Sequence, residues 1–185
     1  TENNAVKYAD YAIGEFFKKA KMSSYWKDTI FIIVADHDIR VRGDSLVPIK
    51  HFHIPGLILG ADIQPKKLTA IASQIDLPVT LLSLMGIHGK HPMTGRELSN
   101  EISDHLGRAM MQYNANFAWM EQTKDLNQVV VLREGKAPAH AIYDTKNKQL
   151  IDVPTPHNAK ALENRALANS LLPALLYSEQ RYRLP

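Results

Sequence analysis

The feature of the sequence that most constrains its fold is the stretch TIFIIVADHD, residues 29–38, in which an apolar run ends at an Asp-His pair. A continuous apolar run of this length is typical of a strand covered on both faces, as in a parallel sheet beneath helices. Before it, Val6, Ile13 and Phe16 recur at helical spacing and lysines follow in the last turn, which predicts a helix over about residues 3–22. A helix that leads into such a strand is half of a doubly wound α/β unit.

The patterning of the chain changes near residue 116. Before it, the run IPGLILG (residues 54–60) predicts a second short buried strand, and Asp76 and Gly86 mark the N-cap and the C-terminal stop of a short helix. After it, four short β-prone runs separated by turn residues predict an antiparallel meander of three or four strands. A polar helix is expected over about residues 158–180, kinked or split by Pro173.

Composition limits the classes of function. The 185 residues are 45 % hydrophobic and 22 % charged with a net charge of +3, and Lys and Arg form no dense run, which argues against a nucleic-acid-binding protein. The absence of cysteine excludes disulfides, thiolate metal sites and a cysteine nucleophile. No apolar run approaches the roughly 18 residues needed to span a bilayer. Because the sequence begins almost inside a helix, we expect a piece of a longer chain.

Asp36 and His37 are the strongest candidates for a functional site. Sites in open α/β sheets gather outside the carboxyl ends of the strands, where this pair is expected. A carboxylate oxygen and an imidazole nitrogen together suit Mn²⁺, Zn²⁺ or a similar divalent ion better than Ca²⁺. Two ligands are too few for a metal site, so the others must come from elsewhere. The alternative is an aspartate that caps a loop and a histidine that packs.

A second group of candidates precedes the second predicted strand. Strand alternation puts His51 and His53 on one side of the chain, where they could bind a phosphate or sulfate oxygen, donate a proton or complete a metal shell. Arg40, Arg42 and Lys50 add the positive charge that an anionic substrate requires. The alternatives are a half-buried histidine pair and an ordinary charged loop.

The other candidates are weaker. Arg96 lies in MTGREL, where the glycine indicates a turn first. The chain contains no serine-elbow motif, no glycine-rich phosphate loop and no His-Glu-x-x-His motif, so its residues mark no nucleophile. The remaining histidines are expected in turns or at the surface: His88, His91, His105, His140 and His157.

Several segments occur in an order that resembles a known family: KYADYAIGEFF…WKDTIFIIVADHD, HIPGLILG, IDLPVTLLSLMGI and MTGREL. Over about residues 3–98 the chain resembles sulfatases of the alkaline phosphatase superfamily, and most closely the lipoteichoic acid synthase or phosphoglycerol transferase branch. The resemblance implies an α/β fold. Residues 1–115 would be the C-terminal part of an alkaline-phosphatase-like doubly wound sheet, and residues 116–185 a smaller antiparallel α+β subdomain that ends in a helix.

The resemblance also implies roles for particular residues. Asp36 and His37 would be two ligands of a divalent metal ion, Mn, Zn or Mg rather than Ca, and His53, His51 and Arg40 would contact the substrate. The remaining ligands and the nucleophile of such enzymes (Thr in the phosphoglycerol transferase branch, a modified Cys or Ser in true sulfatases) lie upstream, on earlier strands. The chain by itself is therefore expected to be inactive.

The implied function is that of a metal-dependent transferase or hydrolase that attacks phosphate or sulfate esters through a covalent intermediate. The partners would be such an ester, for example a lipid-linked phosphoglycerol, and the missing N-terminal part of the same protein. The location would be periplasmic or otherwise extracytoplasmic, with anchoring by N-terminal helices absent here. Asp38 stands where sulfatases commonly carry glycine, which leaves the substrate open. The alternative is a non-catalytic binding or regulatory module derived from the same fold.

Overall fold

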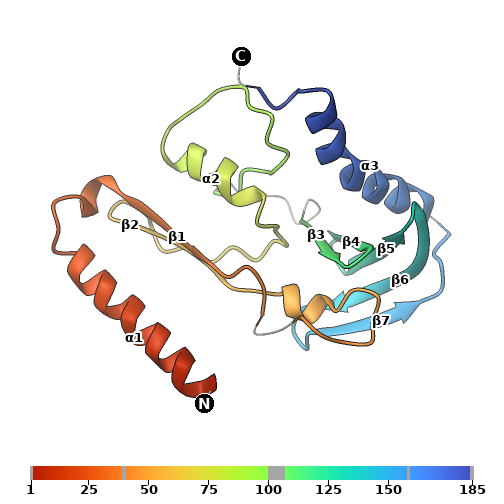
Figure 1. The fold of residues 1–185 in the computed structure, drawn as a ribbon, viewed down its shortest axis with the longest axis horizontal. Coiled ribbons are helices and arrows are strands. Elements are labelled where there is room, and N and C mark those ends of the chain that lie inside the picture. Colours follow the sequence, from red (N-terminus) through yellow and green to blue (C-terminus); the bar gives the residue numbers. More distant parts are fainter. Residues whose placement is uncertain (1, 39–40, 100–106, 158, 184–185) are drawn as a thin grey trace. The chain divides into compact units, whose positions relative to one another are not determined.

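The computed structural model describes residues 2–38, 41–99, 107–157 and 159–183. Along the chain they form α1, β1, β2, α2, the strands β3 to β7 and α3 (Figure 1). Two short 3-10 helices, η1 (Trp26–Asp28) and η2 (Ile49–Phe52), lie between these elements. The chain divides into two compact units, residues 1–35 with 55–66 and residues 36–54 with 67–185.

The first unit is a helix beside a two-stranded sheet. It contains α1 (Glu2–Ala20), β1 (Ile30–Val34) and β2 (Gly56–Gly60), so the predicted helix and both predicted strands form. The strands pair antiparallel, with Ile30 opposite Gly60, although continuous apolar runs are typical of parallel sheets. A continuous apolar run indicates how a strand is covered, but it carries no information about the direction of the neighbouring strand.

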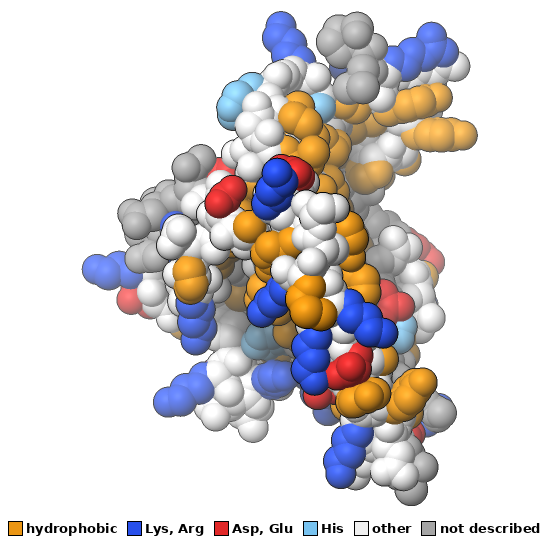
Figure 2. Space-filling view, turned by 90° about the vertical axis from the view of Figure 1, so that its left-hand side faces the viewer, with side chains coloured by type: hydrophobic (Ala, Val, Ile, Leu, Met, Phe, Trp, Pro, Cys, Tyr) orange, Lys and Arg blue, Asp and Glu red, His pale blue; other side chains and the backbone are white. Residues whose placement is uncertain are grey.

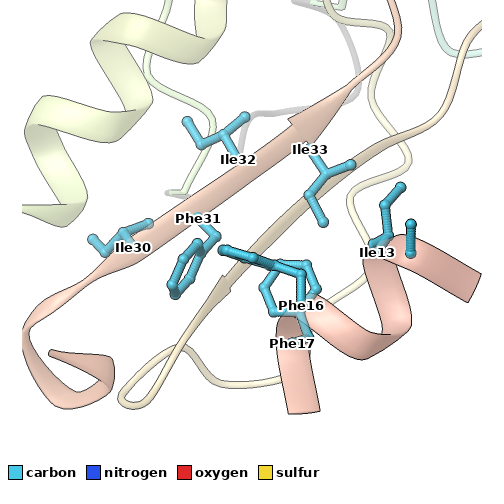
Figure 3. A pocket seen from close by; sticks show the side chains of 8 residues that line it. Ile13, Phe16, Phe17, Ile30, Phe31, Ile32 and Ile33 are labelled. Carbon is cyan, nitrogen blue, oxygen red and sulfur yellow. The ribbon is translucent and has the colours of Figure 1, made fainter. Parts of the chain in front are cut away.

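Aromatic side chains hold α1 against β1. Phe16 and Phe17 contact Phe31 edge-on, with ring centroids 6.0 and 5.2 Å away, and Trp26 stacks on the same ring at 5.4 Å. An open hollow of about 570 Å³ lies beside these rings (Figure 3). Further towards the N-terminus the predicted apolar stripe of α1 is exposed, since Val6 keeps 62 % of its accessible surface.

The second unit is built on a five-stranded antiparallel meander in the order β3-β4-β5-β6-β7. The predicted meander is thus confirmed, with one strand more than expected. The additional strand is β3, whose sequence RAMMQY contains no β-branched residue and so lacks the usual compositional sign of a strand. The strands are β3 (Arg108–Tyr113), β4 (Asn116–Gln122), β5 (Asn127–Arg133), β6 (Lys136–Asp144) and β7 (Gln149–Val153).

Both faces of this sheet are covered. One face packs against the segment that contains Val47 and Ile49, and the other packs against α3 (Ala159–Ser178) through Leu162 and Ala166. Double coverage explains why the strand sequence QVVVL is continuously apolar instead of alternating. The first face presents Met111, Ala118, Met120, Val129, Val131, Ala141 and Tyr143, and the second presents Trp119, Val130 and Leu132.

The helices of the second unit differ from expectation in two details. In α2 (Asp76–Leu84) the N-cap is Ile75, and Asp76 is the first helical residue. Gly86, with φ of +69°, ends that helix as predicted. α3 continues past Pro173, so of the two predicted effects of that proline, a kink or a split, the split does not occur. Among the described residues, no helix is long and apolar enough to cross a membrane.

The face of the molecule in Figure 2 shows hydrophobic side chains at the surface between Lys and Arg side chains. The basic side chains are scattered over this face, in keeping with the spacing of Lys and Arg along the sequence. Exposed apolar residues of α1 include Val6, Tyr8, Tyr11, Ile13 and Phe16.

Candidate functional site

Asp36 and His37 converge in the turn that follows β1. The backbone N–H of His37 donates to Asp36 Oδ1 over 2.9 Å, and His37 Nε2 lies 3.5 Å from Asp36 Oδ2. Both side chains are open to solvent, with 87 % of the Asp36 side chain and 46 % of the His37 side chain exposed. The turn therefore brings one carboxylate oxygen and one imidazole nitrogen to a common, accessible point.

The other nitrogen of the His37 ring determines its tautomer. Nδ1 contacts the backbone carbonyl oxygen of Asp38, which can only accept, so Nδ1 carries the proton and donates it. In the neutral ring Nε2 then presents a bare lone pair towards the Asp36 carboxylate. Two acceptors that face each other in this way repel unless a proton or a cation lies between them.

The pair fits a divalent cation as two ligands of a larger set. Two donors bound to a tetrahedral ion at about 2.1 Å stand about 3.4 Å apart, and Asp36 Oδ2 and His37 Nε2 are 3.5 Å apart. A metal-binding histidine usually donates its second N–H to a carbonyl or carboxylate, as His37 does here. The described residues contain no group of three or more His, Cys, Asp or Glu arranged to hold a metal ion.

Asp38 and His51 form a second imidazole–carboxylate contact beside the first. His51 Nδ1 lies 3.1 Å from Asp38 Oδ2, and the backbone N–H of Asp38 donates to the carbonyl oxygen of His51 over 2.9 Å. His51 keeps only 18 % of its side-chain surface, whereas Asp38 keeps 52 %. His51 thus joins the Asp36–His37 turn to η2.

His53 points elsewhere. Its Nδ1 lies 3.1 Å from the hydroxyl of Tyr143 in β6, and its ring meets the tyrosine ring edge-on. Burial and the nearby Lys148 cation lower the pKa of His53, so its ring is neutral near pH 7. Burial, with a smaller contribution from Asp144, raises the pKa of Tyr143 to about 12, so its hydroxyl keeps its proton.

The expectation that His51 and His53 share one side of an extended chain is wrong. His51 lies in the 3-10 helix η2 and His53 directly follows it, and three residues per turn separate side chains that a strand would align. Of the three expected cations, Arg42 and Lys50 are exposed, and Arg40 lies outside the described residues.

Within the second unit, the loop that carries the site packs on the five-stranded sheet through its own apolar residues. Val47 and Ile49 are 0 % and 2 % exposed and belong to the core on one face of the sheet. The side-chain amide of Asn116 in β4 donates to the carbonyl oxygen of Leu46 over 2.8 Å. The side-chain amide of Gln74 donates to the carbonyl oxygen of Asp36 over 3.3 Å. These contacts fix the loop at both ends.

Two buried polar clusters escaped prediction. His140, expected at the surface, is 4 % exposed, and its Nε2 lies 3.1 Å from Glu163 of α3. Alternation along β6 puts His140 on the opposite side of the sheet from its apolar neighbours, but no local pattern indicates that α3 covers that side. Arg96, considered as a substrate contact, is turned inward, where its Nη2 contacts Asp76 and the carbonyl oxygens of Ile71 and Arg108. His105 lies outside the described residues.

Comparison with known proteins agrees with this architecture. The family model for sulfatases matches residues 1–87. A curated relative, phosphoglycerol transferase I from Xanthomonas euvesicatoria pv. vesicatoria (strain 85-10), is 36 % identical over 85 residues, which are 44 % of this chain and 12 % of that protein. A crystal structure of a protein in the alkaline phosphatase superfamily from Vibrio parahaemolyticus matches all of this chain with a TM-score of 0.88 and 48 % identity, and the match covers 44 % of that protein's chain.

The full-length match assigns the fold to the alkaline phosphatase superfamily. The family match over residues 1–87 and the full-length structural match both support the resemblance to sulfatase-like proteins of that superfamily that the sequence predicted. The α/β fold class is confirmed by the same structural match. The chain spans less than half of the length of these two relatives.

Proposed function

We propose that this chain supplies the Asp36–His37 ligand pair of a divalent-metal site in a phosphoglycerol transferase or sulfatase-like hydrolase. The observation that carries the proposal is that His37 Nε2 lies 3.5 Å from Asp36 Oδ2, directly after β1. The match to the sulfatase family and the similarity to a phosphoglycerol transferase support this choice of enzyme class. The ion, Mn, Zn or Mg, would supply Lewis acidity towards a phosphate or sulfate ester.

The other residues of the loop have complementary roles. His53 is neutral near pH 7 and exposed, so a ring N–H can donate a hydrogen bond to an ester oxygen. The Lys148 cation, which lowers the pKa of His53, also favours the binding of an anion nearby. Arg40 is proposed as a second substrate contact. The proposal assigns the nucleophile and the remaining ligands to parts of such enzymes outside these 185 residues. It assigns the whole enzyme an extracytoplasmic location and a substrate such as lipid-linked phosphoglycerol.

Titration of the whole enzyme that contains these residues with Mn²⁺, followed by electron paramagnetic resonance of the free ion, tests the ligand pair. Asp36→Ala and His37→Ala should each weaken binding at least tenfold, because each removes one of two donors. Asp62→Ala and His88→Ala remove an exposed carboxylate and an exposed imidazole elsewhere, and should leave the affinity unchanged. Equal affinity in the unaltered enzyme and in both ligand variants would refute the assignment.

A non-catalytic module is the second candidate, and one observation favours it. Asp36 Oδ1 already accepts the backbone N–H of His37, so this carboxylate is partly satisfied without a metal. The same titration separates the candidates, since a module without a metal site shows no saturable Mn²⁺ binding. Addition of inorganic phosphate or sulfate is a second test. An ester-binding site that holds the metal should bind one of these anions, and the Asp36→Ala and His37→Ala variants should not.

A further inference from the structure

Asp38 uses three separate groups to connect the two histidines of the loop. Its backbone N–H donates to the carbonyl oxygen of His51, and its Oδ2 accepts from His51 Nδ1. Its own carbonyl oxygen accepts the Nδ1 proton of His37. Movement of His51 relative to the Asp36–His37 turn therefore breaks contacts to Asp38, the residue whose carbonyl oxygen holds the His37 ring.

The position of His51 is fixed by residues near it that pack into the core of the sheet. It lies in η2 beside Ile49, which is 2 % exposed, and four residues after Val47, which is fully buried. Both apolar side chains pack into the core of the sheet. A carboxylate can only accept, so His51 Nδ1 carries the proton in its contact with Asp38. Packing thus fixes η2, η2 carries His51, and His51 fixes Asp38.

We infer that Asp38 and His51 form a positioning pair, which holds the His37 ring in the orientation and tautomer that expose Nε2 next to Asp36. The inference rests on the proposed function and deepens it. It gives His51 a role different from the expected substrate contact, because its Nδ1 is already committed to Asp38 at 3.1 Å. Partners that orient metal-binding histidines typically change metal affinity 10- to 100-fold when removed.

The test is a metal titration of the whole enzyme that contains these residues with Mn²⁺, and with Co²⁺, whose visible absorption reports on the donor set. His51→Ala should weaken Mn²⁺ binding about tenfold or more and alter the Co²⁺ spectrum. His51→Asn should restore the affinity to within about threefold, because an asparagine amide nitrogen can donate from nearly the position of imidazole Nδ1. Asp38→Ala should resemble His51→Ala, and Asp38→Asn, whose amide oxygen can still accept, should resemble the unaltered chain. His88→Ala is the matched control for loss of one exposed imidazole.

Thermal unfolding in excess chelator separates positioning from simple loss of structure. If His51→Ala and His51→Asn unfold at the same temperature but differ tenfold in Mn²⁺ affinity, the pair acts on the site. If His51→Ala and Asp38→Ala both bind Mn²⁺ within twofold of the unaltered chain, or if His51→Asn fails to restore binding, the inference is wrong. In either of those cases the proposed function stands as long as Asp36→Ala and His37→Ala each weaken binding at least tenfold. It fails on its own if they do not.

Discussion

Replacing Gly95 by alanine is expected to destabilise the second unit by roughly 3 kcal/mol. An alanine Cβ at this position would lie 1.9 Å from the carbonyl oxygen of Ile75 and 2.9 Å from Asp76 Cα. Both neighbours are backbone atoms, so no side-chain rotation relieves the overlap, and the first turn of α2 must move by about 1 Å. Overpacking of this kind costs about 1–3 kcal/mol.

The movement also affects a charged hydrogen bond. The backbone N–H of Arg96 donates to Asp76 Oδ1 over 2.7 Å, and Asp76 is fully buried. A hydrogen bond to a charged group contributes about 1.5–3 kcal/mol, and partial loss of it brings the total to the value above. For a chain of this size the loss corresponds to a fall of roughly 6–12 °C in the unfolding temperature.

Urea denaturation measures the effect in a Trp26→Phe background. The sequence contains two tryptophans, so the remaining fluorescence comes from Trp119, which is 2 % exposed and lies in the same unit as Gly95. Gly89→Ala is the control, because a Cβ there meets nothing within 4 Å, and it should be neutral or stabilise by up to about 1 kcal/mol. A Gly95→Ala variant as stable as the Gly89→Ala variant would show that the close approach at Gly95 does not constrain α2.

Three further outcomes are expected. Ile49→Ala should lower the free energy of unfolding by about 2–5 kcal/mol in urea titration, whereas Leu171→Ala, at an exposed position, should change it by less than about 0.5 kcal/mol. Burial raises the pKa of Glu121, but hydrogen bonds from Arg165 and Trp119 outweigh burial and leave the pKa below 4.5. The ionised Glu121 therefore stabilises the fold at pH values above its unfolded-state pKa, and this contribution is lost as the pH falls through its folded-state pKa. Arg165→Met should move acid unfolding, followed by circular dichroism, to higher pH. Burial raises the pKa of Tyr143 to about 12, so the protonated hydroxyl contributes fully to stability below pH 10 and this contribution is lost between about pH 10 and 12. Ultraviolet titration should show one tyrosine that ionises at higher pH than the others, and Tyr143→Phe should remove it. A Tyr143→Phe titration identical to that of the unaltered chain would contradict this.

The elements that could be predicted from the sequence are those with a local signal. The helical stripe before residue 22, the apolar runs of β1 and β5, and the positive φ at Gly86 depend on residues a few positions apart. The proximity of Asp36 to His37 is of the same kind, because neighbours at a strand end need only one turn to converge. Whether these two residues bind metal stays a prediction.

What could not be predicted depends on distant partners. His140 finds Glu163 across 23 positions, and Arg96 finds Asp76 across 20, and no periodicity in the sequence marks either pair. Apolar runs likewise predict that β1 and β2 are strands without indicating that they pair antiparallel. The short helix η2 belongs to this group, since the Val47–Ile49 segment that leads into it packs on a sheet that begins only at Arg108.

The attachment of the site loop to the sheet has a consequence for biosynthesis. His53 contacts Tyr143, a residue 90 positions later, and Asn116 holds Leu46 across 70 positions. Because a chain is made from its N-terminus, the Asp36–His37 turn leaves the ribosome long before the strands that shape its loop. The loop can reach its final form only after β6 has been synthesised and paired, and such long-range closure is slow. Until then the acidic and imidazole side chains of the loop lie on a segment that lacks its contacts to the sheet.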